Sequence, residues 1–264
     1  MRPATSATTL LYHDIFVARP SESGFPGAGA DRYKLSSARF ALHLAAISAA
    51  QPLPATSILG RSASATFHLA FDDGGSSSLA VADALEARGW IGHFFVATDY
   101  VGKPAFLDAA GVRALHSRGH IVGSHTCSHP SAMADLPADA IAREWGESGA
   151  RLADLIGAPI VTGSIPCGSY TRRVAEAAGE AGITHLFTSE PTATSWRIGP
   201  VELLGRYSIV ATTRPEQAAA LARGEPLAAT AQLIGWNAKR AVRRTVGPLW
   251  HVAREHLLTS RRPQ

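Results

Sequence analysis

The sequence is poor in cysteine and in charge, and it contains no long apolar run. Its two cysteines, Cys127 and Cys167, exclude a disulfide-stapled scaffold and a zinc site made of four thiolates in a chain of 264 residues. Charged residues amount to 17% and apolar residues to 46%, which is a globular composition and not a disordered one. The longest uncharged stretch, residues 40–60, is interrupted by a histidine, a glutamine and two prolines. We therefore expect no membrane-spanning helix.

The two ends of the chain bear on its cellular location. Residues 1–16 have one arginine and a scant apolar run, which does not fit a signal peptide, so we expect a cytoplasmic protein. Residues 231–264 carry a net charge of +6 against −2 for the rest, and Trp236 and Trp250 lie among their basic residues. This basic amphipathic tail resembles a segment that docks on an anionic membrane surface, here the inner face. The alternative is a pair of helices packed on the body. Nucleic acid is not expected, because no binding motif accompanies the charge.

Short apolar runs alternate with alanine-rich helical patterns, which favours β/α units around a mostly parallel sheet. Seven strands are predicted, at residues 9–12, 66–71, 92–97, 120–123, 161–165, 184–188 and 201–209. A helix capped by Ser36 or Ser37 is expected to bury Phe40, Leu42, Leu44 and Ile47. We expect a barrel-like α/β domain over residues 1–230 and a helical tail over 231–264. In such folds the chemistry gathers at the carboxyl ends of the strands.

Two neighbouring carboxylates, Asp72 and Asp73, follow the second predicted strand and precede Gly74 and Gly75. Because the glycines relax the backbone at the strand end, both side chains are able to turn toward one mouth. One carboxylate on a metal and one acting as a base is a known division of hydrolytic work. A solvated acidic turn is the alternative.

His125 and His129 follow another strand with a spacing of four, which places both imidazoles on one side of a helical turn or tight loop. Two histidines and one carboxylate leave an open metal position for water, as in catalytic zinc sites. Two surface histidines are the alternative. Cys127 lies in the middle of this spacing and is not expected to be a ligand.

Two further strand ends carry weaker signals. Pro166 and Gly168 predict a tight loop around Cys167, whose N–H groups would be able to form an oxyanion hole, although an ordinary turn has the same pattern. His13 ends the first predicted strand, where a structural histidine is the common case.

In their order and intervals, the FDDG motif at 71–74, the HTCSHP motif at 125–130 and the PCGSY motif at 166–170 resemble the polysaccharide deacetylase family, the NodB homology domain. The resemblance covers about residues 9–210. It implies a distorted (β/α) barrel and a divalent metal, usually zinc, in an enzyme that removes N-acetyl groups from amino sugars. Carried over by position, it implies metal ligation by Asp73, His125 and His129, with Asp72 as the general base and the N–H of Cys167 as the oxyanion donor.

The chain departs from the family pattern in three ways, the first being that Cys167 replaces the usual aromatic residue. Residues 162–164 replace the arginine that commonly contacts the base, and residues 203–207 lack the late Leu-x-His of the general acid. His13 becomes the candidate acid, because Tyr12-His13 is similar to the N-terminal strand of permuted relatives. Arg206 is expected to supply the missing guanidinium near Asp72 or to bind an anionic substrate group, with a surface arginine as the alternative. Tyr170 is the second candidate for substrate binding.

Together, the residues and the resemblance predict a metal-dependent hydrolase that removes N-acetyl groups from an amino sugar of a polysaccharide, an oligosaccharide or a lipid-linked glycan. One alternative is a deformylase or another small-amide hydrolase of the same fold. The other is a non-catalytic glycan-binding or scaffolding barrel, which the missing arginine and the displaced acid would permit.

Overall fold

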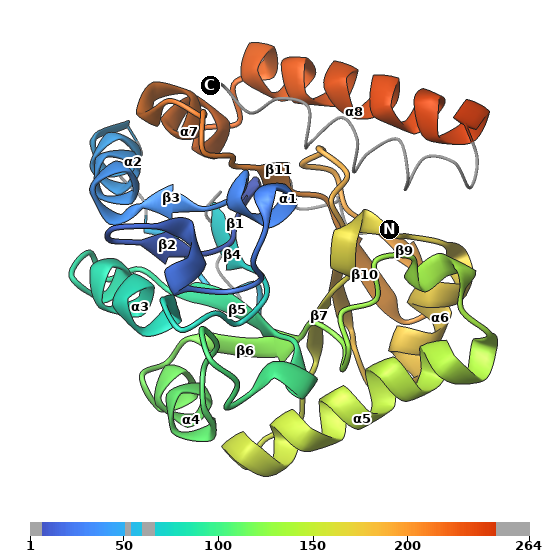
Figure 1. Cartoon of the computed structure of the whole chain (residues 1–264). Helices are drawn as coiled ribbons and strands as arrows, with labels where there is room; N and C mark the ends of the chain where they lie inside the picture. Colours follow the sequence, from blue (N-terminus) through green and yellow to red (C-terminus); the bar gives the residue numbers. More distant parts are fainter. Residues whose placement is uncertain (1–6, 51–53, 60–66, 247–264) are drawn as a thin grey trace.

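The computed structural model describes residues 7–50, 54–59 and 67–246, with side chains as far as residue 238. In this part of the chain, nine strands form one sheet that curls into a half-barrel, with helices on its outer side (Figure 1). The strand order is β11-β1-β4-β5-β6-β7-β8-β10-β9, and all neighbours run parallel except β10 and β9. The expected barrel-like α/β fold is therefore confirmed.

The strands of the main sheet are short. They are β1 (Thr9–Tyr12), β4 (His68–Phe71), β5 (Gly92–Val96), β6 (Ile121–Ser124), β7 (Thr162–Ser164), β8 (His185–Phe187), β9 (Trp196–Ile198), β10 (Val201–Leu204) and β11 (Tyr207–Ser208). A separate parallel pair is formed by β2 (Ile15–Phe16) and β3 (Leu35–Ser36). The pattern of the sequence does not predict β2, β3 or β9, because two or three residues are too few to establish a periodicity.

The helices that cover the sheet are α2 (Ser37–Ala50), α3 (Ser78–Glu86), α4 (Ala109–Ser117), α5 (Ala138–Ile156), α6 (Arg172–Glu180) and α7 (Pro215–Ala222). In α2, the buried side chains are those of Phe40, His43, Leu44 and Ile47. The prediction that Leu42 is buried was wrong, since this side chain is 59% exposed. Its position lies off the stripe with spacings of three and four that faces the core.

Residues 201–209, predicted as one strand, form two strands near opposite ends of the sheet order, with β11 at one edge and β10 next to the other edge strand, β9. β10 pairs with β8, whereas β11 pairs with β1, and only Gly205 and Arg206 separate them. The chain therefore crosses the open seam of the half-barrel within two residues. A Cβ atom at Gly205 would lie 2.4 Å from the carbonyl oxygen of Thr192, so the crossing requires glycine. The apolar residues on both sides hide this break from the sequence pattern.

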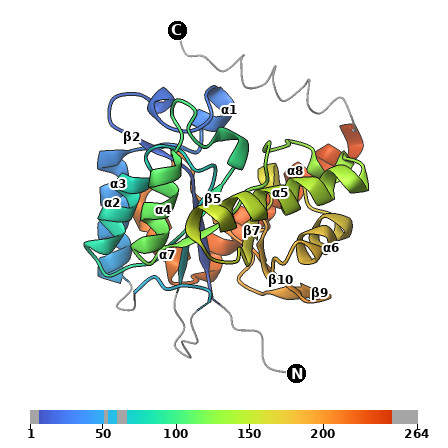
Figure 2. The same cartoon turned by 90° about the horizontal axis from the view of Figure 1, so that it is seen from below.

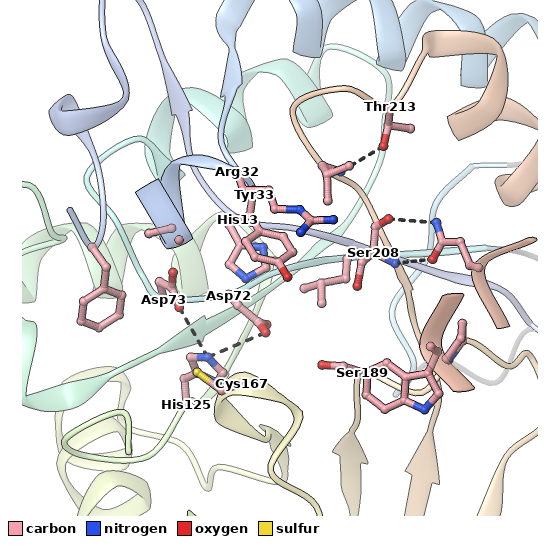
Figure 3. Close-up of a pocket in the computed structure, with 18 of the residues that line it drawn as sticks. His13, Arg32, Tyr33, Asp72, Asp73, His125, Cys167, Ser189, Ser208 and Thr213 are labelled. Atoms are coloured by element: carbon pink, nitrogen blue, oxygen red, sulfur yellow. Dashed lines mark hydrogen bonds and ion pairs between the residues drawn. The ribbon is translucent and has the colours of Figure 1, made fainter. Parts of the chain in front are cut away.

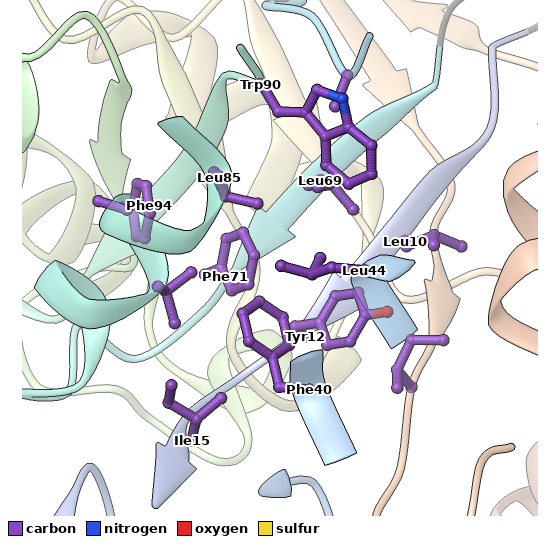
Figure 4. Close-up of a cluster of buried hydrophobic side chains, with 14 of the residues drawn as sticks. Leu10, Tyr12, Ile15, Phe40, Leu44, Leu69, Phe71, Leu85, Trp90 and Phe94 are labelled. Atoms are coloured by element: carbon purple, nitrogen blue, oxygen red, sulfur yellow. The ribbon is translucent and has the colours of Figure 1, made fainter. Parts of the chain in front are cut away.

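Aromatic side chains fix which residues of the central strands face outward. The rings of Tyr12, Phe71 and Phe94 stack across β1, β4 and β5, with centroids 5.6 and 5.1 Å apart, in the core beneath the helices (Figure 4). Because successive side chains of a strand point to opposite faces, the next residues, His13 and Asp72, are directed toward the barrel interior. The packing of the outer core therefore sets the orientation of the residues at the strand ends.

Two segments lie around the barrel and complete its rim. The short helix α1 (Ala28–Asp31) and β2 lie at the end where β1 finishes (Figure 2). The long helix α8 (Pro226–Val246) runs past α7 and β11 (Figure 1). The boundary expected between residues 230 and 231 thus falls inside a helix that begins at Pro226. Trp250 and the rest of the tail from residue 247 lie outside the described residues.

We predict that Leu152→Ala will lower the free energy of unfolding by about 2–5 kcal/mol, because Leu152 on α5 is fully buried and the change leaves a cavity in the core. Leu227→Ala is the matched control, since Leu227 on α8 is 87% exposed and the same change there should stay within about 0.5 kcal/mol. Urea denaturation of both variants measures the difference. Equal losses would contradict this description of the core.

Candidate active site

The carboxyl ends of the central parallel strands bring the chemistry-bearing residues together. Tyr12 and Phe71 are partners in the register of β1 and β4, so the residues that follow them, His13 and Asp72, emerge side by side. His125 directly follows β6, the strand next to β5, and Ser164 ends β7. All of these side chains therefore meet at one mouth of the barrel.

Asp73, His125 and His129 place one ligand atom each in a common cluster. Oδ1 of Asp73 lies 3.5 Å from Nε2 of His125 and 3.4 Å from Nε2 of His129, and the three atoms lie within 4.8 Å of one another. His125 Nδ1 lies 2.8 Å from the carbonyl oxygen of Ser164. An Nδ1–H donated to that carbonyl leaves Nε2 as a lone pair directed at the cluster. The histidine-pair spacing thus produces a compact group of donors.

The backbone of this cluster adopts conformations that non-glycine residues rarely take. Asp73, Thr126, His129 and Cys167 have φ values of 80°, 65°, 56° and 53°. Such conformations persist only where the surroundings enforce them, and they gather at functional sites. The enforcing contact for the histidine loop comes from Glu144 of α5, whose carboxylate accepts the N–H groups of Cys127 and Ser128 at 2.8 and 2.9 Å.

Cys127 takes no part in the cluster. Its thiol hydrogen-bonds to the carbonyl oxygen of Glu144, on the side of the loop that faces α5. The sequence argument that this cysteine faces away from His125 and His129 agrees with this contact.

Asp72 is held in a buried ion pair with Arg206. Nη1 and Nη2 of Arg206 donate to the two carboxylate oxygens of Asp72 at 2.7 and 3.0 Å. The Ser164 hydroxyl bridges the pair, because it accepts from Nη2 of Arg206 and donates to Oδ2 of Asp72. Nε of Arg206 donates to the carbonyl oxygen of Thr188. Arg206 is fully buried, at 0% exposure. The guanidinium that the sequence lacks before the PCGSY motif is thus supplied from the seam between β10 and β11.

The charges around both aspartates keep them ionised. Burial alone would raise the pKa of Asp72, but the guanidinium of Arg206 outweighs it and holds this pKa below its usual range. Burial also opposes ionisation of Asp73, yet hydrogen bonds from His125 and His129 hold its pKa well below the usual range. For His125, burial lowers the pKa, but Asp72 and Asp73 together bring it above its usual value. The site therefore presents two carboxylates with different partners.

His13 lies beside these carboxylates (Figure 3). Its ring packs against that of Tyr33, with centroids 4.9 Å apart, and its buried Nδ1 has no hydrogen-bond partner among the described residues. Burial lowers the pKa of His13, and the charges of Asp73 and Asp72 oppose this effect. An imidazole with an unsatisfied nitrogen next to two carboxylates is suited to exchange protons with a ligand.

A cavity of about 520 Å³ opens above this group (Figure 3). Asp72, Asp73, His13, His125, His129 and Cys167 line its inner end. Phe25 adds an apolar wall and packs on the ring of His129, with centroids 4.5 Å apart. The cavity has the size of an ordinary small-ligand site.

The two residues expected to bind substrate, Arg206 and Tyr170, do not line this cavity. Arg206 lies beneath Asp72 and is fully occupied by it, Ser164 and Thr188. Tyr170 packs against the ring of Trp196 in a separate core cluster. Trp236, which the sequence offers to a membrane surface, instead lines the cavity from α8.

Comparison with known proteins agrees with the motifs. Residues 60–186 match the family described as polysaccharide deacetylase. These residues form a polysaccharide deacetylase domain. This domain makes the protein a hydrolase of the carbohydrate N-deacetylase class. A search of curated protein sequences finds no match.

Solved structures share the fold of this deacetylase at low sequence identity. A polysaccharide deacetylase from Bacillus cereus is 17% identical, with a TM-score of 0.68 over 83% of this chain and 69% of that one. IcaB from Ammonifex degensii is 19% identical, with a TM-score of 0.67 over 83% and 97%. The deacetylase PplD from Streptococcus pyogenes, solved with acetate, is 17% identical, with a TM-score of 0.64 over 81% and 96%.

Sequence reasoning missed Ser164 and Glu144. Ser164 stands where the arginine of the family is absent, so its position at a strand end was a usable signal. Glu144 has no such signal, because it lies in the middle of a helix with ordinary amphipathic spacing.

Among the described residues, no helix combines the length and apolar character that crossing a bilayer requires.

We predict that Arg206→Ala will lower the free energy of unfolding by about 3–5 kcal/mol at pH 7, because it leaves the buried Asp72 carboxylate unpaired. Arg118→Ala should cost at most about 1 kcal/mol, since its pairs with Asp83 and Glu86 lie at the surface.

Urea denaturation over a range of pH measures both variants. Because the pKa of Asp72 is depressed in the folded protein, the stabilisation is present above the ordinary aspartate range and is lost as the pH falls through the lowered pKa. The difference in the free energy of unfolding between the wild type and Arg206→Ala should therefore become smaller as the pH falls through this range. A loss no larger than that of Arg118→Ala, or one independent of pH, would contradict the role of the buried pair.

Proposed function

We propose that this deacetylase removes N-acetyl groups from amino sugars by metal-assisted hydrolysis at the mouth of the barrel. The observation that carries the proposal is the pairing of a three-donor cluster, Asp73, His125 and His129, with a separate ionised carboxylate, Asp72, in one cavity. Oδ2 of Asp72 lies 3.7 Å from Nε2 of His125, but both oxygens of this carboxylate are paired with Arg206, and the ionised group is suited to act as a base.

The three donors fit a divalent metal. Ligand atoms at about 2.1 Å from a common ion in tetrahedral geometry are about 3.4 Å apart, and the Asp73–His125 and Asp73–His129 separations are 3.5 and 3.4 Å. Two imidazoles and one carboxylate form a donor set typical of catalytic zinc. We therefore propose zinc, held by Asp73 Oδ1, His125 Nε2 and His129 Nε2. When bound, it supplies Lewis-acid chemistry to a carbonyl oxygen and a water molecule.

The side chains around the metal position divide the proton transfers. Asp72 accepts the proton of the attacking water, and Arg206 keeps its carboxylate ionised and oriented. The N–H of Cys167, on a loop held at φ 53°, donates to the oxyanion that forms on the acetamido carbon.

His13 then protonates the departing amine of the sugar. Burial lowers its pKa, so its protonated form is a stronger acid than an ordinary imidazolium. The alternative of a non-catalytic barrel rested on the absence of the family's arginine and general acid from their usual positions. In this proposal Arg206 takes the place of that arginine, and His13 takes the place of the acid. Release of acetate from N-acetylated amino sugars by the purified protein tests the proposal, and release of formate alone from N-formyl analogues would replace it with a deformylase.

The metal site and the base are separable by mutation. His129→Ala should lower zinc content and activity together, because it removes a ligand. Asp72→Asn should retain zinc and lose turnover by about 100-fold or more, because it removes the proton acceptor. The exposed His116 on α4 provides the control variant His116→Ala, which should change neither. Metal analysis and acetate release measure these effects, and equal zinc loss in the Asp72 and His129 variants would refute the division of roles.

The acid is tested by the leaving group. His13→Gln should slow the hydrolysis of an N-acetyl sugar by about 100-fold with zinc content unchanged, because the amine must be protonated to leave. 4-Nitrophenyl acetate, whose phenolate departs without protonation, should be hydrolysed at nearly the wild-type rate. If both substrates are slowed equally, His13 serves another purpose.

We also propose that α8 docks the enzyme on an anionic membrane surface. Leu227 and Ile234, seven residues apart on one face of the helix, are 87% and 65% exposed, and the helix continues into a basic stretch. Trp236 contributes nothing to this face, because it lines the cavity. Basic residues near anionic lipids contribute about 1 kcal/mol each.

Vesicle sedimentation tests the docking. Binding to phosphatidylserine-containing vesicles should weaken at high salt, and the double change Leu227→Ser with Ile234→Ser should weaken it further. Leu42→Ser is the matched control, since Leu42 is 59% exposed on α2. Absence of binding at low salt, or the same loss in the control, would leave α8 with a role in packing only.

A further inference from the structure

The cavity extends well beyond the metal cluster, and the function proposed above leaves its outer half unused. This outer half lies between Arg32 and Tyr33, at the end of α1, and Gln232 and Trp236 of α8, with Ser208 between them. Figure 3 shows Arg32 and Tyr33 on one side of Ser208 and the metal-binding end of the cavity below them. An N-acetyl group at the inner end would thus place the rest of its substrate here.

The wall contributed by α8 is fixed in place. The side-chain amide of Gln232 accepts the N–H of Ser208 at 3.0 Å and donates to the Ser208 carbonyl at 2.9 Å, which ties the helix to β11. The ring of Trp236 packs over Gly168, where a Cβ atom would lie 3.3 Å from it. The side of the outer half that α8 forms is therefore a preformed wall and not a surface loop.

Arg32 is the one charged side chain that the described residues place in this outer half. Its guanidinium is directed into the cavity (Figure 3) and makes no hydrogen bond or ion pair with a described side chain. The neighbouring Lys34 differs, because its ammonium is buried and donates to the carbonyl oxygens of Pro20 and Phe25. The guanidinium of Arg206 is likewise unavailable, because it is paired with Asp72. Of these three described cationic side chains, only that of Arg32 has donors available to a ligand.

The charges of the inner end do not neutralise Arg32. Asp72 is already balanced by Arg206, and Asp73 would be more than balanced by a divalent metal. Arg32 is an exposed residue that lines the cavity, so its unbalanced positive charge is accessible to an incoming ligand of opposite sign. A guanidinium matches phosphate and carboxylate oxygens through paired N–H donors.

We propose that Arg32 forms an anion subsite, so that the substrate is an amino sugar that carries a phosphate or carboxylate group besides its N-acetyl group. This inference rests on the proposed deacetylation and names its substrate class. The anion lies at the cavity mouth, and the sugar spans the distance from Arg32 to the metal cluster between Tyr33 and Trp236.

Matched substrates test the subsite. N-acetylglucosamine 1-phosphate supplies a phosphate, N-acetylmuramic acid supplies a carboxylate, and methyl N-acetylglucosaminide supplies neither. The wild-type enzyme should have a KM at least about tenfold lower for one of the two anionic sugars, which is what one charge-assisted contact gives. The sugar that is favoured identifies the anion.

Arg32→Gln should remove this preference by raising the KM of the anionic sugar about tenfold, with kcat and the neutral glycoside unaffected. Arg32→Lys should restore part of it, because the charge returns without the paired donors. Arg113→Gln is the control, since Arg113 is an exposed arginine of α4 outside the cavity. No preference in the wild type, or the same change in the control, would overturn the subsite.

Binding of the deacetylated sugar separates this inference from the proposed function. Glucosamine 1-phosphate cannot be hydrolysed at an amide, so calorimetric titration measures its affinity without turnover. Muramic acid, which also lacks the amide, serves in the same way if the carboxylate sugar is the favoured substrate. The deacetylated form of the favoured sugar should bind the wild type about tenfold more tightly than methyl glucosaminide does, and Arg32→Gln should abolish the difference. If no acetate is released from any sugar but this difference is present, the deacetylation fails and the subsite stands. Equal binding of glucosamine 1-phosphate, muramic acid and methyl glucosaminide would overturn the subsite whatever the activity.

Discussion

Two adjacent carboxylates, Asp72 and Asp73, are buried side by side at 5% and 6% exposure, and the surrounding structure compensates for their charges. Two buried negative charges on neighbouring residues are unfavourable unless each is paired. Asp72 pairs with Arg206 and Ser164 and lies 3.7 Å from Nε2 of His125, whereas Asp73 pairs with both His125 and His129. Because the partners differ, the two carboxylates acquire different chemistry from identical side chains.

The position of Arg206 links this pairing to the closure of the barrel. The chain passes from β10 to β11 through Gly205 and Arg206, and this crossing spans the seam between the two edges of the sheet. The guanidinium enters the interior at this crossing and donates to both carboxylate oxygens of Asp72. Arg206, which keeps Asp72 ionised, therefore also lies where the fold closes.

Much of the fold and part of the site could be predicted from the sequence, for identifiable reasons. Alternating strands and helices give the barrel, and the rule that chemistry follows strand ends singles out Asp72, Asp73, His125 and His13. The long-range pairing of Arg206 with Asp72 was predicted as one of two roles, since a missing guanidinium is visible in the motifs but its source is not. The two-residue crossing at Gly205 was missed, because buried apolar residues flank it on both sides.

Other parts of the site depend on tertiary contacts that leave no local signal. Tyr170 is the last residue of the PCGSY motif and was expected to bind the substrate, yet its ring packs against that of Trp196. The basic residues near Trp236 in the sequence predicted a membrane contact for this side chain. In the structure Gln232 holds α8 against β11 through two hydrogen bonds, and Trp236 on the same face of the helix lines the cavity. Glu144, which holds the strained histidine loop, is an ordinary helix residue in the sequence.

The central claim is that one carboxylate binds the metal while its neighbour, held by arginine, stays off it. A crystal structure of the zinc-loaded enzyme, with the ion located by its anomalous scattering, tests this most directly. The account predicts an ion bonded to Asp73, His125 and His129, with Asp72 still paired with Arg206 and outside the coordination sphere. An ion bonded to Asp72, or one bound elsewhere in the molecule, would contradict it.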